Sequence, residues 1–316
     1  MPTKKFEDEL KKVNQFKLKG TDDILELIES LVETGFNAKR LAKACHIYKE
    51  MVEDNDCTKF FGLAGALIPV GMQGIIHDFL ENGFIDIFVT TGASLTHDIA
   101  ETLGFHHLQG EMNIQNLDDA KLYDYKLNRI YDVFLPNNVY EGIEDFISGL
   151  EIPDNSMPVS NFLKFLGEQL PDNPNSILKI CAEKQIPIFC PAFTDSGLAL
   201  QLGFHHRNLN LNHFKDMLKM VDLAWDTKHA GVCIVGGGVP KNFIFQSLQF
   251  CPSSAIYAIQ ITMDRPETGG LSGATLEEAI SWGKVSKSAK YSTIVSDATI
   301  VLPLILLYLK KALNLK

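Results

Sequence analysis

Lys284 lies in the segment LEEAISWGKVSKSA, residues 276–289, directly after Trp282 and Gly283. A lysine that attacks a carbonyl or imine carbon must be held in a pocket and partly removed from water. The indole of Trp282 is suited to line such a pocket, because its face attracts a cation and packs against an aliphatic stem. These residue types therefore allow imine chemistry, whereas a lysine on a solvated helix face, beside a tryptophan of the core, is the ordinary alternative.

Glycine-rich and hydroxyl-rich turns offer a second kind of chemistry. The triple glycine Gly236, Gly237 and Gly238 would let a backbone approach a phosphate at a helix N-terminus, although tight packing alone would also need glycine. The usual dinucleotide fingerprint GxGxxG is absent. The hydroxyls of Thr90 and Thr91 suit a nucleotide and equally suit helix capping.

Two carboxylates end apolar segments in the same manner. Asp195 follows IPIFCPAFT, and Asp297 follows STIVS. A carboxylate at the end of a buried strand is costly unless it has a partner. Each is therefore a candidate ligand-binding residue, with the N-cap of the next helix as the alternative.

The elements that must position these residues alternate between strands and helices. The segments 85–104, 186–203, 230–250 and 292–313 each resemble a strand, a turn and a helix, and 255–262 resembles a strand. Near-continuous apolar strands between helices indicate a parallel sheet covered on both faces. Ligands bind such sheets at the carboxyl ends of the strands, so we expect the polar turns to share one edge.

We therefore predict an α/β fold with a doubly wound, mostly parallel sheet of Rossmann-like type. Residues 1–50 show helical periodicity and are predicted to form an N-terminal helical extension. Residues 51–316 are predicted to form a single NAD-binding α/β catalytic domain, because no repeat or Pro/Ser-rich linker divides them. Within it, the segment 151–175 resembles a surface loop that carries one helix.

Composition excludes several function classes. The net charge of −10 argues against a nucleic-acid-binding protein, which is normally basic. The longest apolar run, 300–309, is too short for a membrane span and contains a proline, and the N-terminus resembles no secretory signal. The six cysteines form no CxxC pair, so we expect buried free thiols rather than disulfides or zinc. We expect a cytoplasmic protein.

The histidines give no metal-binding pattern. Adjacent residues of the pairs His106-His107 and His205-His206 point in different directions, and no carboxylate lies at a recognisable ligand spacing. We predict no metal site, and a surface or interface role for both pairs. His97 follows the hydroxyl turn and is a candidate for chemistry or cofactor contact.

Several motifs together resemble the deoxyhypusine synthase family over roughly residues 30–310. The segments are EEAISWGKV, SDATIVLPLIL, GGGVPK and PIFCPAFTDSG. Members of this family are NAD-dependent transferases that oxidise spermidine, pass its aminobutyl group to an active-site lysine as an imine, and deliver it to an acceptor amine. Because the hydride is later returned to the new imine, NAD is recycled.

The resemblance implies a role for each candidate residue. Lys284 would be the imine-forming lysine, and Trp282 and Glu278 would bind the polyamine. It also implies a homotetramer, assembled from tight dimers with sites at the dimer interface. The NAD-contacting positions would be Asp195, Gly236, Gly237, Gly238 and Asp297, joined by the hydroxyl turn at Thr90 and Thr91.

Three positions depart from the family pattern. Asn242 stands where the family has a substrate-binding histidine, and Leu200 and Leu271 stand where it has acids that hold charged nitrogens of spermidine. The turn TTGASLTHD, together with IYDVFLP at 130–136, is similar to the deoxyhypusine synthase-like subgroup found outside eukaryotes. Each lost charge-assisted contact weakens recognition of a tri-cation by about 1.5–3 kcal/mol.

Three functions fit these observations. The favoured one is aminobutyl transfer from a spermidine-like donor to a small di- or polyamine, which gives a homospermidine-type product. The second is modification of a lysine of the hypusine-bearing translation factor, against which the lost acids weigh. The third is a non-catalytic NAD-binding oligomer, against which the retained Lys284 weighs.

Overall fold

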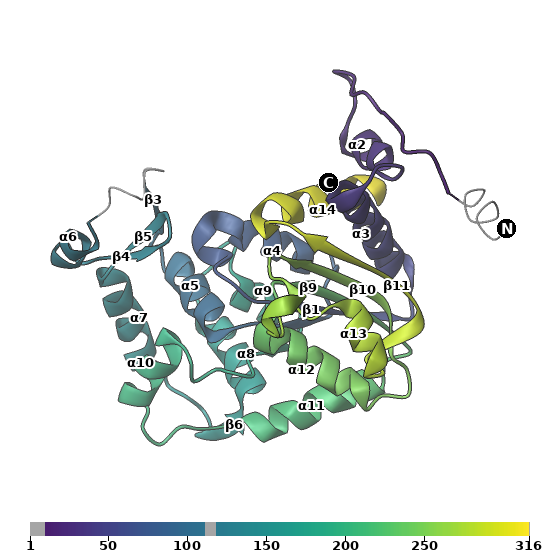
Figure 1. Cartoon of the computed structure of the whole chain (residues 1–316). Helices are drawn as coiled ribbons and strands as arrows, with labels where there is room; N and C mark the ends of the chain where they lie inside the picture. Colours follow the sequence, from purple (N-terminus) through teal and green to yellow (C-terminus); the bar gives the residue numbers. More distant parts are fainter. Residues whose placement is uncertain (1–9, 111–117, 316) are drawn as a thin grey trace.

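The computed structural model describes residues 10–110 and 118–315 (Figure 1). Its central sheet has the strand order β11-β10-β9-β1-β2-β7, and all neighbouring strands are parallel. The order reverses direction between β1 and β9, which is the switch point of a doubly wound sheet. The strands are β1 (Cys57–Leu63), β2 (Ile87–Val89), β7 (Ile188–Phe189), β9 (His229–Val235), β10 (Ala255–Thr262) and β11 (Val285–Val295).

Helices cover both faces of this sheet, as the apolar strands require (Figure 1). Two separate core clusters form, one on each face. The predicted fold class is therefore confirmed. One face carries α2 (Ile24–Leu31), α3 (Phe36–Glu53), α4 (Gln73–Glu81), α9 (Ile177–Glu183) and α14 (Ala298–Ala312), and the other carries α11 (His213–Trp225), α12 (Gly238–Gln249) and α13 (Leu276–Ser281).

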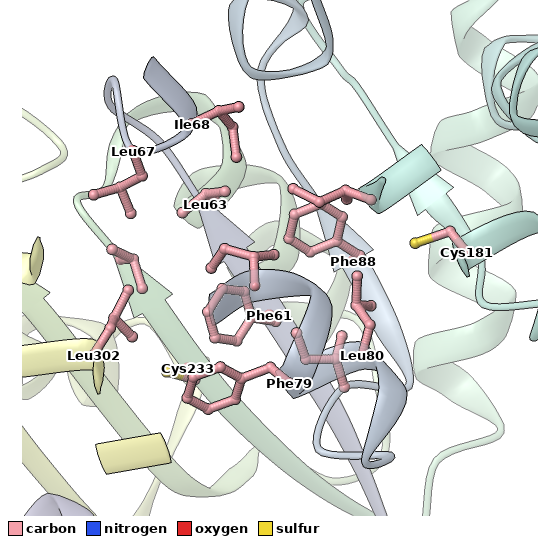
Figure 2. Packing of buried hydrophobic residues seen from close by; sticks show 14 of the residues in the cluster. Phe61, Leu63, Leu67, Ile68, Phe79, Leu80, Phe88, Cys181, Cys233 and Leu302 are labelled. Atoms are coloured by element: carbon pink, nitrogen blue, oxygen red, sulfur yellow. The ribbon is translucent and has the colours of Figure 1, made fainter. Parts of the chain in front are cut away.

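The centre of the first core is a group of aromatic rings around β1 (Figure 2). Phe79 of α4 lies 5.8 Å from the Phe61 ring and 5.6 Å from the Tyr48 ring, measured between centroids. Tyr48 belongs to α3 and donates its hydroxyl hydrogen to the Phe84 carbonyl oxygen. Helix α3, which spans the predicted boundary at residue 50, therefore packs directly on the sheet, and the division of the chain at that residue stays a prediction.

The segment 151–175 differs from its prediction as a surface loop. It contains β6 (Ser156–Pro158) and α8 (Val159–Gln169). Helix α8 packs against β7 and α9, and Phe162, Leu163 and Leu166 are fully buried. The surface prediction was wrong because the prolines and polar residues at both ends of the segment concealed one strongly apolar helix face.

A further group of elements lies beside the β2–β7 side of the sheet, at the left of Figure 1. Its helices α5, α7 and α10 contact one another, and β3, β5 and β4 form an antiparallel sheet. The elements are α5 (Gly92–Thr102), β3 (Leu108–Gln109), α6 (Asp119–Asp124), β4 (Leu127–Ile130), β5 (Val133–Pro136), α7 (Asn138–Ser148) and α10 (Gly197–His205). Elsewhere β8 (Asn210–Asn212) pairs with β6, and η1 (Ile68–Met72) and η3 (Pro266–Thr268) are short helical turns.

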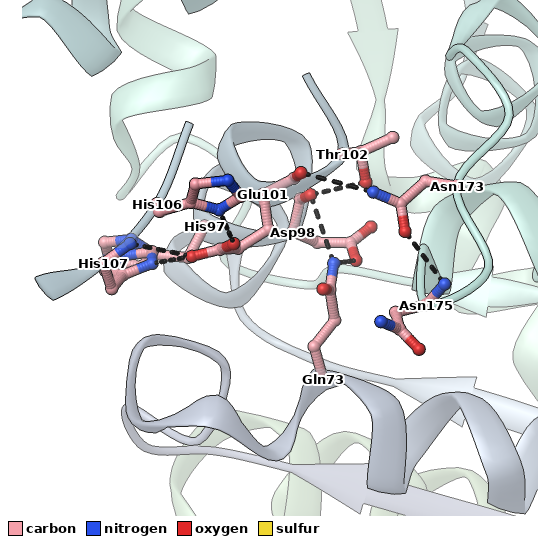
Figure 3. Close-up of polar contacts among 9 residues, drawn as sticks. All are labelled: Gln73, His97, Asp98, Glu101, Thr102, His106, His107, Asn173 and Asn175. Carbon is pink, nitrogen blue, oxygen red and sulfur yellow. Dashed lines mark hydrogen bonds and ion pairs between the residues drawn. The ribbon is translucent and has the colours of Figure 1, made fainter. Parts of the chain in front are cut away.

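Asp98 links α5 to α4 and α9 by hydrogen bonds (Figure 3). Its carboxylate is completely buried and accepts hydrogen bonds from the backbone N–H groups of Ile177 and Leu178, at 2.9 Å each. The side-chain amide of Gln73 donates a further bond of 2.7 Å. A carboxylate at a helix N-terminus is stabilised by these otherwise unpaired donors, so Asp98 caps α9 from another element.

Two expectations about the whole chain can be compared with the described residues. All six cysteines are free thiols and five of them are buried, as predicted. Burial raises the pKa of Cys45 and Cys190 to about 12, so these thiols are unreactive. Among residues 10–110 and 118–315, no helix has the length and apolar character that crossing a bilayer requires.

Replacement of Phe79 tests the aromatic core. We expect Phe79→Ala to lower the free energy of unfolding by about 3–5 kcal/mol, because the surrounding rings cannot close the cavity. Urea denaturation measures this change. Tyr123→Ala is the control: that ring is 83% exposed on α6, so the variant should stay within about 0.5 kcal/mol of wild type. Equal losses in both variants would contradict the packing described.

Candidate functional site

The triple-glycine turn follows β9 at the switch point of the sheet. Gly236 and Gly238 have φ values of 73° and 55°, a left-handed conformation that favours glycine. Ala64, which follows β1, donates its N–H to the Val235 carbonyl oxygen at 3.0 Å. The turn therefore lies where ligands bind in doubly wound sheets, at the ends of β1 and β9.

A loop after β10, residues 263–275, packs tightly on this turn. Ser272 Oγ accepts a hydrogen bond of 3.1 Å from the N–H of Gly238. A Cβ atom on Gly237 would lie 2.4 Å from Ser272 Cα, a distance that backbone atoms cannot tolerate. Close packing thus requires glycine at 237. Of the two explanations that the sequence offered for the triple glycine, tight packing is therefore sufficient at this residue, and no phosphate contact is needed to explain it.

The two predicted threonines already have partners within the protein. Thr90 is buried, and its hydroxyl donates to the Leu63 carbonyl oxygen at 3.2 Å, which joins the ends of β2 and β1. Thr91 is the N-cap of α5 and accepts from the N–H of Ser94. Both hydroxyls therefore have structural roles, and their contact with a cofactor stays a prediction.

Asp195 and Asp297 lie far apart in this chain. Asp195 is exposed in the turn after β7, whereas Asp297 follows β11 and is the N-cap of α14. These strands are the two edges of the sheet, five strand spacings apart, which corresponds to about 24 Å. A single chain does not gather both carboxylates around one ligand.

A pocket of about 280 Å³ lies between α12 and α13. It brings together all four residues that the sequence proposed for catalysis and substrate binding, namely Asn242, Glu278, Trp282 and Lys284. Among the described residues, Glu278 is the only one that contributes a carboxylate to its lining. The remaining lining residues are Lys241, Phe245, Gln246, Gln249, Leu271, Ala274, Thr275 and Ala279.

Local backbone geometry orients Lys284 toward Trp282. Helix α13 ends at Ser281, Trp282 is its C-cap, and Gly283 takes the left-handed conformation with φ 71°. The chain then turns into β11, and Lys284 Nζ lies 5.4 Å from the centre of the Trp282 ring. The indole is 59% exposed, so the burial that the sequence suggested for this segment is incomplete in one chain.

Lys241 is a pocket residue that sequence reasoning left without a role. Its side chain is 4% exposed, and burial lowers its pKa to about 8, with Glu278 opposing and Lys284 adding to the shift. Its Nζ donates to Gln260 Oε1 at 3.0 Å. A signal existed, because Gln260 interrupts the apolar run AIYAIQIT and a buried amide needs partners.

The two leucines at the family's acidic positions fall in different places. Leu271 lines the pocket and is 47% exposed. Leu200 lies on α10, is 61% exposed, and does not contribute to the pocket of its own chain. Of the two leucines at positions where the resemblance implies an acid, Leu271 is therefore the one in this pocket.

A second hollow, of about 380 Å³, opens at the ends of β10 and β11, and Thr275 lines both it and the pocket. Arg40 and Lys43 of α3 contribute two cations to its wall. The hydroxyl of Thr293, also in the wall, is buried and has no hydrogen-bond partner in the described part of the chain. Asp264 and Glu277 add two carboxylates to the same wall, so the hollow and its unpaired buried hydroxyl suit a polar ligand.

The first histidine pair, His106 and His107, forms hydrogen bonds with one carboxylate (Figure 3). Glu101 binds Nδ1 of both His106 and His107, at 3.0 and 2.6 Å, and these contacts lower the pKa of Glu101 to about 2 despite its partial burial. His107 Nε2 lies 2.8 Å from His97 Nδ1. Burial, helped by the nearby His107, lowers the pKa of His97 to about 4, so its ring is neutral at pH 7.

The second pair has a different setting. His205 lies 2.9 Å from a Glu144 carboxylate oxygen, and His206 lies 2.7 Å from the Ile147 carbonyl oxygen. These bonds join α10 to α7. The prediction was a surface or interface role for both pairs, but the His107 side chain is only 4% exposed and bonds to Glu101 and His97 of its own chain.

Comparison with known proteins was made for both sequence and structure. The family model described as deoxyhypusine synthase matches residues 26–309. A protein from Methanosarcina thermophila named probable deoxyhypusine synthase is 45% identical over 284 residues, which cover 89% of this chain and 88% of its own length. Probable deoxyhypusine synthase 1 of Archaeoglobus fulgidus is 43% identical, covering 90% of this chain and 93% of that protein.

A solved structure has the same fold. It is the crystal structure of an Entamoeba histolytica protein assigned as a deoxyhypusine synthase, which superposes with a TM-score of 0.63 at 20% identity. The match covers 94% of this chain and 96% of that one. At this identity, the likeness concerns the fold alone.

Proposed function

Because the chain belongs to the deoxyhypusine synthase family, we propose that it is an NAD-dependent transferase that moves an aminobutyl group from a spermidine-like donor to an acceptor amine. The observation that supports this proposal most directly is the pocket that Lys284 shares with Trp282 and Glu278. NAD supplies the chemistry of hydride removal and return at the carbon beside the donor's secondary nitrogen.

The pocket residues divide the remaining work. The neutral amine of Lys284 attacks the oxidised donor carbon and displaces the rest of the donor as a free amine. The aminobutyl group is then held on Lys284 as an imine until the acceptor amine attacks the same carbon and displaces Lys284. The Trp282 ring lies against the aliphatic carbons of the bound aminobutyl group, and the Glu278 carboxylate attracts the terminal ammonium of that group. Asn242 offers an amide where the family has a histidine, so it binds substrate without acting as a base.

We propose that NAD binds next to this pocket. In the second hollow, Arg40 and Lys43 would face the diphosphate, and the unpaired Thr293 hydroxyl would gain a partner. Asp297 follows β11, whose last residues line this hollow, and its proposed role is to contact the cofactor there. The triple-glycine turn would contact the cofactor from the end of β9.

The proposed acceptor is a small di- or polyamine, with a homospermidine-type product. With Glu278 as its single carboxylate, the pocket matches a short amine better than a long tri-cation. The alternative acceptor, a lysine of the hypusine-bearing translation factor, is favoured by the names of the relatives. The non-catalytic alternative would give Lys284 no function.

We further propose that the enzyme is a homotetramer whose sites are completed between chains. The exposed Trp282 needs cover before Lys284 can lose water, and Asp195 and Asp297 lie at opposite sheet edges. Helix α11 exposes an apolar stripe at helical spacing that self-association would bury. The stripe consists of Phe214, Met217, Leu218 and Trp225.

Lys284→Arg tests the chemistry. The variant should lose transfer, because a guanidinium stays protonated and forms no imine. Incubation of wild type with NAD, labelled spermidine and borohydride should leave a stable adduct on Lys284, located by mass spectrometry of peptides. NAD binding, measured by calorimetry, should be nearly unchanged in the variant because its contacts lie elsewhere.

Lys287→Arg is the matched control for this experiment. Lys287 is an exposed lysine on β11, three residues after Lys284, and its replacement by arginine should leave the wild-type activity unchanged. Retained transfer in Lys284→Arg, or an adduct on Lys241 instead, would reject the assigned mechanism. Absence of NAD binding by wild type, with and without polyamine, would reject the cofactor.

Leu271→Asp tests substrate selection by the pocket. Restoring a carboxylate should lower the KM for spermidine about tenfold through one charge-assisted contact. Leu108→Asp is the control, because Leu108 is also 47% exposed but lies on β3.

The identity of the acceptor is tested with wild type in the same assay, where label from spermidine should be transferred to a diamine rather than to the translation factor. Preferred labelling of the factor would establish the alternative acceptor.

Mixed assemblies test whether two chains share a site. Lys284→Arg and Asp195→Ala should each be inactive alone. If Lys284 and Asp195 of one site come from different chains, random mixed dimers should recover roughly a quarter of wild-type activity by two-fold symmetry. Light scattering reports the assembly of each sample. No recovery in demonstrably mixed assemblies would place both residues of a site in one chain.

A further inference from the structure

The Lys241 ammonium is surrounded by acceptors that use all of its hydrogens. Besides Gln260 Oε1, it donates to the Leu271 carbonyl oxygen at 3.0 Å and to the Ala274 carbonyl oxygen. An ammonium group has three donors and no acceptor, so three acceptors satisfy it completely. A neutral amine would leave one of these acceptors unpaired.

Gln260 extends the same network through its amide hydrogens. Its side chain is fully buried within β10 and donates to the Gly236 carbonyl oxygen at 3.1 Å and the Ser272 carbonyl oxygen at 2.8 Å. Both hydrogens of the amide are thus used, as burial demands. The network joins the glycine turn, β10, α12 and the loop 263–275.

The loop that this network holds contributes to both parts of the site. Leu271 and Ala274 line the amine pocket, while Ser272 binds the Gly238 N–H and packs on Gly237. We propose that Lys241 is a positioning residue, whose ammonium fastens the loop 263–275 between the glycine turn and the amine pocket. The consequence for turnover rests on the proposed aminobutyl transfer, whereas the effect on the loop does not.

This role separates the two lysines of the pocket. All three hydrogens of the Lys241 ammonium are donated to oxygens of the protein, which favours the protonated form. A protonated nitrogen has no lone pair with which to attack carbon. Lys284 Nζ contacts a ring face instead and is free to react. The lowered pKa of Lys241, about 8, still leaves it mostly protonated at pH 7. One lysine is therefore a fixed cation and the other the nucleophile.

Hydrogen–deuterium exchange of the full-length protein tests the proposal without ligand. In Lys241→Met the stem is kept while charge and donors are lost, so peptides from 263–275 should exchange about tenfold faster than in wild type. Peptides from β1 and α4 should be unchanged. Lys241→Arg, which keeps charge and donors, should restore most of the protection.

Lys219→Met is the matched control. Lys219 is also a partly buried lysine, on α11, and it donates to Ser160 Oγ and Asn161 Oδ1, away from the loop. Its replacement should leave exchange of 263–275 unchanged. If Lys241→Met does not fold, Lys241→Gln, which keeps an amide donor, carries the same comparison.

Two results would overturn the proposal. One is unchanged exchange of the loop in folded Lys241→Met, and the other is equal acceleration throughout the chain, which would make Lys241 a general stabiliser. As a functional readout, the Kd for NAD and the KM for the donor should rise together in Lys241→Met. Failure of wild type to bind NAD would remove the proposed function but leave the exchange result standing.

Discussion

The parallel direction of all six central strands is the constraint on which the site depends. Crossovers join the successive strands of this sheet, so all carboxyl ends meet at one edge. The strands themselves are buried and apolar, and they give no room to groups that must meet water or substrate. Chemistry is therefore confined to the turns and to the helices that cover the sheet. The second hollow lies at the carboxyl ends of β10 and β11, whereas the amine pocket lies along α12 and α13 and receives Lys284 from the amino end of β11.

Features encoded within short segments were predictable from sequence. Apolar runs between glycine turns identified the strands and the fold class, because burial on both faces leaves a continuous hydrophobic pattern. The motif that contains Trp282 and Lys284 predicted one pocket for both residues, and in the structure a single left-handed glycine brings the Lys284 ammonium to the Trp282 ring. The surrounding Glu278 and Asn242 came from the family resemblance, and the fold gathers them in the same pocket.

Features that depend on strand order and tertiary packing were not predictable. Asp195 and Asp297 look equivalent in sequence, each at a strand end, yet the order of the sheet separates them by its whole width. The burial of α8 depends on what covers its apolar face. The network of Lys241 joins residues that are distant along the chain. Gln260 indicated a buried polar group, but the sequence did not show that Lys241 is its partner.

The central position of β1 also affects how the chain is made. β1 pairs with β2 soon after it in sequence, but its other edge pairs with β9, beginning with Cys57 opposite His229. At 5–20 residues per second, a ribosome needs about 10–35 s to synthesise the intervening chain. During that time β1 has an open, apolar edge of the kind that promotes aggregation. The early helices α3 and α4, which pack over β1, can shield its face but not that edge, so newly made chains depend on protection until β9 has emerged.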